Sequence, residues 1–268
     1  MSRLKIGVIG AGAWGANHVR TVAGLADAEL AGVCDVNPDV RARLARQFPG
    51  VFVTEDAAEL IRRSEAVVIA APARTHTEFA RQCIEAGKPC LVEKPFGLSA
   101  AEAQGVADAA RTCKVPVLAG HLLLHHPAVE QLKALIQAGE LGRVYYLYSH
   151  RLNLGQVRPD ENALWSFGPH DVSVALFLLA EDPVRVTAQG RCYLQEGIED
   201  VVFLTMAFAS GVLAHVHLSW LDPHKERTLT VVGARKMVTF DDMEPREKLR
   251  IYDKGVDKPP AYGSYGES

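Results

Sequence analysis

No apolar run in this sequence reaches the roughly 18 residues that a membrane-spanning helix needs. Blocks of basic residues are also missing, and the formal net charge is −3, which argues against nucleic acid as a partner. The five cysteines are scattered without a C-x-x-C pair, which favours reduced core residues over disulfides or metal ligands. No charged-then-apolar leader opens the chain, so we expect a cytoplasmic protein without a membrane partner.

The first part of the chain alternates apolar runs with helical patterns. Its 268 residues are 48% hydrophobic, which is enough for one full core or two smaller ones. The apolar runs predict strands at 6–9, 29–34, 51–53, 66–71, 90–93 and 117–120. Strands that alternate with helices at this spacing indicate an α/β fold, here an N-terminal Rossmann domain with a doubly wound parallel sheet. We assign residues 1–120 to this domain and expect ligands at the carboxyl ends of its strands.

The pattern changes after residue 120. Period-two alternation predicts strands at 144–151, 184–194, 200–208, 212–220 and 227–232, and helices are expected at 127–138 and 167–179. Residues 121–268 are therefore predicted to form a C-terminal α+β domain with a largely antiparallel open sheet. We expect the sheet face without helices to make a homodimer or homotetramer contact through His215, His217, Arg185, Arg191 and Tyr193. The Pro/Gly/Ser-rich end after Lys254 is a candidate disordered stretch.

The first predicted strand leads into a glycine-rich turn, Gly10-x-Gly12-x-x-Gly15, with Ala13 and Trp14 inside it. Gly10 permits the tight turn, Gly12 lets the backbone approach a pyrophosphate, and Gly15 lets the following helix pack close to the strand. The phosphate charge would then lie at the positive end of that helix. The alternative is a plain structural turn.

Asp35 ends the second strand, twenty residues past Gly15, where a carboxylate can accept hydrogen bonds from both adenosine ribose hydroxyls. Asn37 follows as the cap of the next helix, and we include it in the cofactor site. A carboxylate at this position repels a 2′-phosphate, so NAD is favoured as the cofactor. Arg41 and Arg43 leave NADP as the alternative.

Glu93-Lys94-Pro95 lies at the carboxyl end of the fifth predicted strand, the edge at which such a sheet binds its ligand. A solvated charged pair at a strand end is the simpler interpretation. The strand terminus, the edge of the sheet and the proline beside the lysine together favour a functional role.

The glycine turn, Asp35, Ala71-Pro72 with His76, and Glu93-Lys94-Pro95 together resemble the glucose–fructose oxidoreductase / inositol dehydrogenase (Gfo/Idh/MocA) family over essentially the whole chain. The resemblance implies that Lys94 contacts nicotinamide and substrate, and that Ala71, Pro72 and His76 lie along the cofactor. It also implies a histidine near the start of the second-domain helix, which matches His170.

The chain departs from the family pattern four residues before His170, where Ser166 occupies the place of a frequent aspartate. Asp171 is adjacent in sequence but points about 100° away on a helix. His170 therefore works without a carboxylate, or Glu161 or Asp160 supplies one, or the chemistry differs. The sequence is also C-terminally short for the family.

The resemblance implies an NAD-dependent dehydrogenase that acts on a secondary alcohol of a sugar, sugar acid, nucleotide sugar or polyol lying between the two domains. His170 would be the general base and Lys94 would bind the same oxygen, although these two roles are interchangeable at this stage. The alternatives are an NADPH-dependent ketoreductase and a nicotinamide-binding regulator that has lost turnover.

The other histidines have weaker assignments. We place His121, after the sixth strand, near the nicotinamide end of the cofactor. The spacings of His121 with His125 and of His215 with His217 could each supply two metal ligands, but neither pair has a third ligand nearby in sequence, so we expect no metal site.

Overall fold

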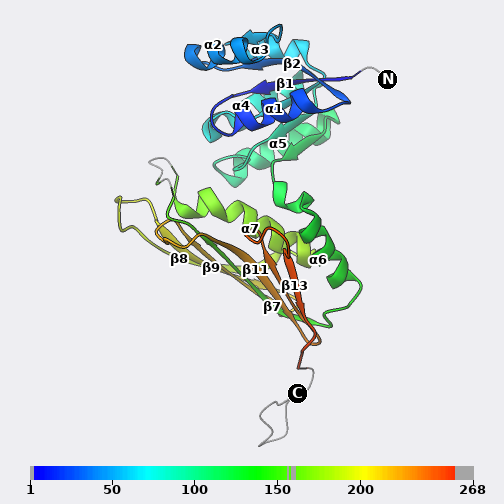
Figure 1. The fold of residues 1–268 in the computed structure, drawn as a ribbon, viewed down its shortest axis with the longest axis vertical. Helices are drawn as coiled ribbons and strands as arrows, with labels where there is room; N and C mark the ends of the chain where they lie inside the picture. Colours follow the sequence, from blue (N-terminus) through cyan, green and yellow to red (C-terminus); the bar gives the residue numbers. More distant parts are fainter. Residues whose placement is uncertain (1–2, 156, 158–160, 257–268) are drawn as a thin grey trace, which may run out of the picture. The chain divides into compact units, whose positions relative to one another are not determined.

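The computed structural model describes residues 3–155, 157 and 161–256. The chain divides into two compact units, Met1–Gly120 and His121–Ser268, and each is described by itself (Figure 1). No helix within the described ranges is long and apolar enough to cross a membrane. All five cysteines are free thiols. Burial raises the pKa of Cys34 to about 11, so this thiol stays protonated in the core.

The first unit contains a six-stranded sheet in the order β3-β2-β1-β4-β5-β6, with every pairing parallel. This confirms the predicted doubly wound sheet. Its strands are β1 (Leu4–Ile9), β2 (Ala28–Cys34), β3 (Val53–Thr54), β4 (Ala66–Ile69), β5 (Cys90–Val92) and β6 (Val117–Ala119). Its helices are α1 (Gly15–Gly24), α2 (Pro38–Gln47), α3 (Ala57–Arg63), α4 (His76–Glu85) and α5 (Ala100–Cys113), with a short 3₁₀ turn, η1 (Ala73–Thr75), before α4.

Apolar side chains fill both faces of this sheet. On one face, α1 and α2 bury Val19 and Leu44 against Val8, Val33 and Val68 of the central strands. On the other face, a second core joins the sheet to α3, α4 and α5 through Leu60, Ile61, Ala80, Cys83, Ile84 and Val106. Both faces of the central strands are therefore covered, which is why these strands read as continuous apolar runs.

Side-chain caps fix where several of these helices begin. The Asn37 side chain accepts a hydrogen bond from Asp39 N, and Pro38 occupies the first position of α2. Asp56 accepts from Ala58 N and Glu59 N at the start of α3. These caps place the loops before α2 and α3 at the carboxyl ends of β2 and β3.

The second unit contains a seven-stranded sheet in the order β13-β12-β11-β7-β10-β9-β8, in which only β7 and β10 pair in parallel among the described strands. Its strands are β7 (Val144–Leu152), β8 (Pro183–Arg191), β9 (Val201–Phe208), β10 (Leu213–Ser219), β11 (Glu226–Gly233), β12 (Met237–Asp241) and β13 (Leu249–Tyr252). The 3₁₀ turn η2 (Leu122–His125) and the helices α6 (Pro127–Gln137) and α7 (Ala163–Leu179) complete it. The predicted, largely antiparallel sheet is confirmed.

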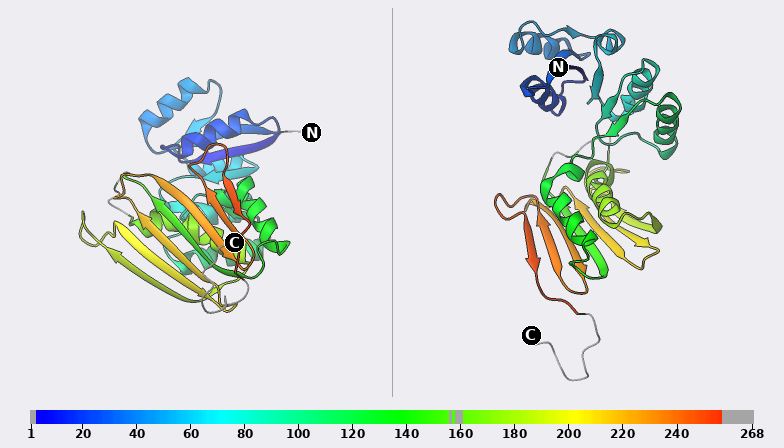
Figure 2. Two further views of the ribbon diagram at one scale, coloured as in Figure 1. Left: turned by 60° about the horizontal axis from the view of Figure 1, so that its bottom comes forward. Right: turned by 90° about the vertical axis from the view of Figure 1, so that its right-hand side faces the viewer.

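The helices α6 and α7 pack on one face of this second sheet, as both views in Figure 2 show. Their apolar residues join the inward-facing residues of the strands in one core, centred on Leu132, Leu178, Val216 and Leu218. Two details differ from the sequence prediction. β12 and β13 were not predicted, and α7 begins at Ala163 rather than Phe167 because Asn162 caps it by accepting from Trp165 N.

The opposite face of the sheet carries aromatic and imidazole rings. We call this surface the open face. The ring of Phe203 on β9 stacks on that of His217 on β10 with centroids 4.4 Å apart. On β7 the ring of Tyr146 stacks on that of Tyr148, the ring of Tyr148 is tilted against His150, and His150 meets His217 edge-on.

Three charged residues are buried in the described part of the second unit. Arg151 on β7 forms an ion pair with Asp171 on α7, with Nε and Oδ2 2.5 Å apart. Asp200 is 0% exposed and accepts hydrogen bonds from Trp220 Nε1 and from the backbone N–H groups of Tyr193 and Leu194, at 2.6, 2.6 and 2.9 Å. Burial would raise the pKa of Asp200, but these donors hold it below its usual value.

Candidate cofactor and active site

The glycine turn joins β1 to α1 with the geometry that close packing demands. Gly10 has a φ of +86°, and a Cβ there would lie 2.6 Å from Ala71 N. A Cβ on Gly15 would collide with the carbonyl oxygen of Gly10. Gly12 differs, because a Cβ there would have no atom of the described protein within 4 Å. Gly10 and Gly15 are thus required by the fold, whereas the space beside Gly12 is available to a ligand.

Asp35 lies directly beside this turn, at the carboxyl end of β2. Its Oδ2 accepts from Ala11 N at 2.8 Å and its Oδ1 accepts from Asn37 N at 2.9 Å. These two bonds hold the carboxylate at the glycine turn, and a carboxylate can accept further hydrogen bonds at each oxygen. The predicted ribose carboxylate therefore has a fixed orientation.

The two arginines near Asp35 are both engaged within the protein. Arg41 forms an ion pair with Glu55 at 2.8 Å and donates to the carbonyl oxygens of Asp35 and Val36. Arg43 donates to the carbonyl oxygen of Ala11 at 3.1 Å. A 2′-phosphate would have to compete for these guanidinium groups and would also approach the carboxylate of Asp35.

Glu93 is 7% exposed and connects the end of β5 to the start of α1. Its Oε1 accepts from Trp14 Nε1 at 2.7 Å and lies 2.7 Å from His18 Nε2, while Oε2 accepts from Lys94 N at 3.1 Å. We call Trp14, His18, Glu93 and the N–H of Lys94 the Glu93 cluster. The half-buried Lys94 thus leaves the carboxyl end of β5 beside the glycine turn.

His76 joins the two other loops at this edge of the sheet. The ring is 1% exposed, with Nδ1 2.8 Å from the carbonyl oxygen of Pro95 and Nε2 2.7 Å from that of Ala71. The buried ring of His76 therefore links the loop that contains Pro72 to the segment that follows Lys94. His121 follows Gly120 at the end of β6.

In the second unit, His170 lies on α7, and its Nδ1 atom is buried. Ser166, one turn earlier, is 5% exposed. Asp171 is committed to Arg151, so its carboxylate faces the sheet. Glu161 precedes the helix and is partly buried, whereas Asp160, the other proposed carboxylate, lies outside the described residues.

The sequence did not reveal two residues that the structure places in buried or partly buried polar contacts, His18 and Arg151. His18 lies four residues after Trp14, so both side chains share one face of α1, and that spacing was the available signal. Arg151 occupies an inward-facing position of β7, where an arginine requires a buried partner. Within the described ranges, no group of three or more His, Cys, Asp or Glu side chains is arranged to hold a metal ion.

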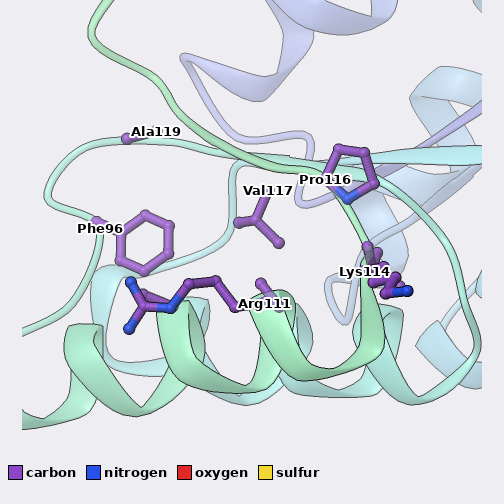
Figure 3. A pocket seen from close by; sticks show the side chains of 9 residues that line it. Phe96, Arg111, Lys114, Pro116, Val117 and Ala119 are labelled. Atoms are coloured by element: carbon purple, nitrogen blue, oxygen red, sulfur yellow. The ribbon is translucent and has the colours of Figure 1, made fainter.

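A hollow of about 570 Å³ lies elsewhere in the first unit, between α5 and the chain around β6. Figure 3 shows the ring of Phe96 beside the side chain of Arg111, with the side chain of Val117 next to them. Neither the glycine turn nor Lys94 lines it. The hollow is therefore distinct from the carboxyl edge that carries the predicted cofactor residues.

Comparison with known proteins identifies the family of this chain. The family model GFO_IDH_MocA, described as "Oxidoreductase family, NAD-binding Rossmann fold", matches residues 4–121, and the GFO/IDH/MocA C-terminal domain matches residues 129–239. Inositol 2-dehydrogenase 2 of Saccharopolyspora erythraea is 32% identical over 224 residues, which are 80% of this chain and 66% of that protein.

Two further relatives cover more of the chain. UDP-N-acetylglucosamine 3-dehydrogenase of Acidithiobacillus ferrooxidans is 30% identical over 266 residues, 97% of this chain and 80% of that protein. The crystal structure of GenD2 from gentamicin A biosynthesis, in complex with NAD, has a TM-score of 0.84 and 29% identity over 90% of this chain and 73% of that one. These matches confirm the resemblance found in the sequence, and the chain belongs to the GFO/IDH/MocA family of oxidoreductases.

Proposed function

We propose that the protein is an NAD-dependent dehydrogenase that oxidises a secondary alcohol of a sugar, sugar acid, nucleotide sugar or polyol. The observation that carries this proposal is the Glu93 cluster, which ties Lys94 to the glycine turn at the carboxyl edge of the parallel sheet. Relatives named as dehydrogenases of inositol and of UDP-N-acetylglucosamine support a carbohydrate substrate.

NAD rather than NADP is the proposed cofactor. Asp35 is held at the glycine turn by two backbone N–H groups, so its charge would face a 2′-phosphate directly. Arg41 is already paired with Glu55, whereas Arg43 donates to the neutral carbonyl oxygen of Ala11 and is the positive charge that keeps NADP as the alternative. The residues proposed to hold the cofactor are Gly10, Gly12, Ala13, Trp14, Gly15, Asp35, Asn37, Ala71, Pro72, His76, Glu93, Lys94 and His121.

Bound NAD would supply the hydride acceptor, and the chain would supply the groups that bind the substrate and move its proton. Lys94 would donate a hydrogen bond to the reacting oxygen and stabilise its developing negative charge. His170 would take the hydroxyl proton at Nε2, since its Nδ1 is buried. Ser166 carries no charge, so an imidazolium at His170 would have no carboxylate partner at that position.

The test mixes purified protein with NAD, or with NADP, and a panel of polyols, sugar acids and nucleotide sugars, and follows the absorbance of reduced nicotinamide. We expect turnover with at least one class of substrate, faster with NAD, and its loss in His170→Ala. Faster turnover with NADP would contradict the role given to Asp35 and would favour the ketoreductase alternative.

A nicotinamide-binding regulator without turnover is the second candidate function. Two observations favour it. Ser166 stands where the family often has an aspartate, and the neighbouring carboxylate of Asp171 is committed to Arg151. Calorimetric binding of NAD with no turnover on any substrate of the panel would favour this candidate over the dehydrogenase.

We also propose that the protein forms a homodimer or homotetramer through the open face. Phe203 and Tyr146 on this face are each 45% exposed, an unusual position for large aromatic side chains. Arg185 and Arg191 share the face with His215 and His217 through the strand register. A surface that mixes stacked rings with polar side chains is suited to bury itself against a second copy.

A further inference from the structure

The carboxylate of Glu93 is enclosed by three segments of the first unit. The start of α1 contributes Trp14 and His18, and the end of β5 contributes the N–H of Lys94. The end of β6 contributes Gly120, where a Cβ would lie 3.1 Å from the Cα of Glu93 and 3.2 Å from its Oε2. The absence of a side chain at Gly120 therefore allows the carboxylate to lie this close to the backbone.

Glu93 is ionised in this environment. Burial alone would raise the pKa of Glu93, but the hydrogen bonds from His18, Trp14 and the N–H of Lys94 hold it below its usual value. Because an ionised carboxylate can only accept hydrogen bonds, the Nε2 atom of His18 must carry the proton in their contact. His18 thus acts as a donor, in parallel with the indole N–H of Trp14.

We propose that His18 is a positioning residue for Lys94 and acts through Glu93, an inference that rests on the proposed role of Lys94 in the reaction. The proton on His18 Nε2 fixes the orientation of the carboxylate, whose second oxygen holds the backbone N–H of Lys94. The same carboxylate holds Trp14 in the glycine turn. His18 therefore sets the position of Lys94 relative to the turn that binds the cofactor phosphates.

The test compares two substitutions at the same site. His18→Gln keeps an N–H donor close to the position of Nε2, whereas His18→Leu removes the donor at similar volume. Arg20→Leu, on the exposed side of the same helix, is the control for a general effect on α1. NAD affinity is measured by calorimetry, kcat on a substrate that wild-type protein turns over, and Tm by thermal unfolding.

We expect His18→Leu to lower kcat about 10-fold or more, since small misplacements of a reacting group reduce rates steeply. Its Kd for NAD should change less than about 3-fold, because the proposed cofactor contacts at Gly12 and Asp35 do not depend on His18. His18→Gln should recover most of kcat, and His18→Leu should add little in a Glu93→Gln background, since both changes break one coupling. A wild-type kcat in His18→Leu would overturn the proposal. It would also be overturned if His18→Gln lost as much kcat and as much Tm as His18→Leu.

A spectroscopic readout separates this proposal from the proposed function. Trp14 donates to Glu93, so its fluorescence should change with pH when Glu93 takes up a proton, and Trp14→Phe identifies that signal against the two other tryptophans. Loss of the His18 donor should move the midpoint to higher pH, because one bond to the charged form is gone. An unchanged midpoint in His18→Leu overturns the proposal. A shifted midpoint in a protein that turns over no substrate supports the His18–Glu93 coupling and contradicts only the dehydrogenase.

Discussion

Substitution by alanine should lower the stability of the protein at Gly15 and its affinity for NAD at Gly12. A Cβ on Gly15 would collide with the carbonyl oxygen of Gly10 and would lie 2.8 Å from its carbonyl carbon. Both are backbone atoms and cannot rotate away, so α1 must shift from β1. Overpacking of this kind costs typically about 1–3 kcal/mol. At Gly12 a Cβ meets nothing within 4 Å among the described residues, and the φ of Gly12 is not among the positive ones.

Gly15→Ala should therefore lower the free energy of unfolding by about 1 kcal/mol, which is a steric cost of about 2 kcal/mol less a gain of roughly 0.5–1 kcal/mol from the better helix former. Gly12→Ala should leave it within about 0.5 kcal/mol of the wild type. NAD affinity should instead fall about 10-fold or more in Gly12→Ala, because the methyl group would occupy space that a pyrophosphate needs.

Urea unfolding followed by circular dichroism, together with calorimetric titration of NAD, measures both effects on the same samples. The reasoning is refuted if Gly12→Ala binds NAD as wild type does, because the space beside Gly12 would then not be the phosphate site. Equal destabilisation of the two variants would refute the steric distinction between them.

Three further predictions concern stability, cofactor choice and assembly. Asp200→Ala leaves three donors without an acceptor, one in a buried contact and two in partly buried ones, and should cost about 3–9 kcal/mol by urea unfolding, at about 1–3 kcal/mol per donor. The pKa of Asp200 is lower in the folded than in the unfolded protein. The stabilisation by its carboxylate is therefore fully present above the unfolded pKa of about 3.9 and is lost as the pH falls through the folded pKa. We expect the free energy of unfolding to fall less steeply with decreasing pH in Asp200→Asn. Asp35→Ser should shift the ratio of NAD to NADP affinity toward NADP by about 10-fold or more, measured by calorimetry, and an unchanged ratio would remove Asp35 from the discrimination. Phe203→Arg on the open face should lower the molar mass seen by light scattering, whereas Leu118→Arg on β6 should not; equal masses for both variants would place the subunit contact elsewhere.

Local signals were sufficient for most of the first unit. The glycine turn, the caps at Asn37 and Asp56 and the continuous apolar runs each act within a few residues, so the doubly wound parallel sheet and the position of Asp35 and Glu93 at its carboxyl edge followed from the sequence. The donors to Glu93 did not, because Trp14 and His18 meet it across 79 and 75 residues of chain.

The differences in the second unit also have physical causes. α7 contains Pro169 well inside it, and a proline is expected near a helix start, so the sequence suggested a later start than the cap at Asn162 gives. β12 and β13 are short, and their strand character depends on pairing outward from β11. Helical geometry alone separates Asp171 from His170. Its partner Arg151 could not be predicted, because that contact depends on how α7 packs on β7.

The most direct test of the account is the turnover of Lys94→Ala beside Lys5→Ala, which removes an exposed lysine near the amino end of β1. Both variants are assayed with NAD and a substrate that the wild-type protein oxidises. The account predicts that Lys94→Ala loses about 10²- to 10⁴-fold in kcat, far more than it loses in NAD affinity, and that Lys5→Ala behaves as wild type. A Lys94→Ala variant that keeps most of its turnover would contradict the assignment of the active site to the end of β5.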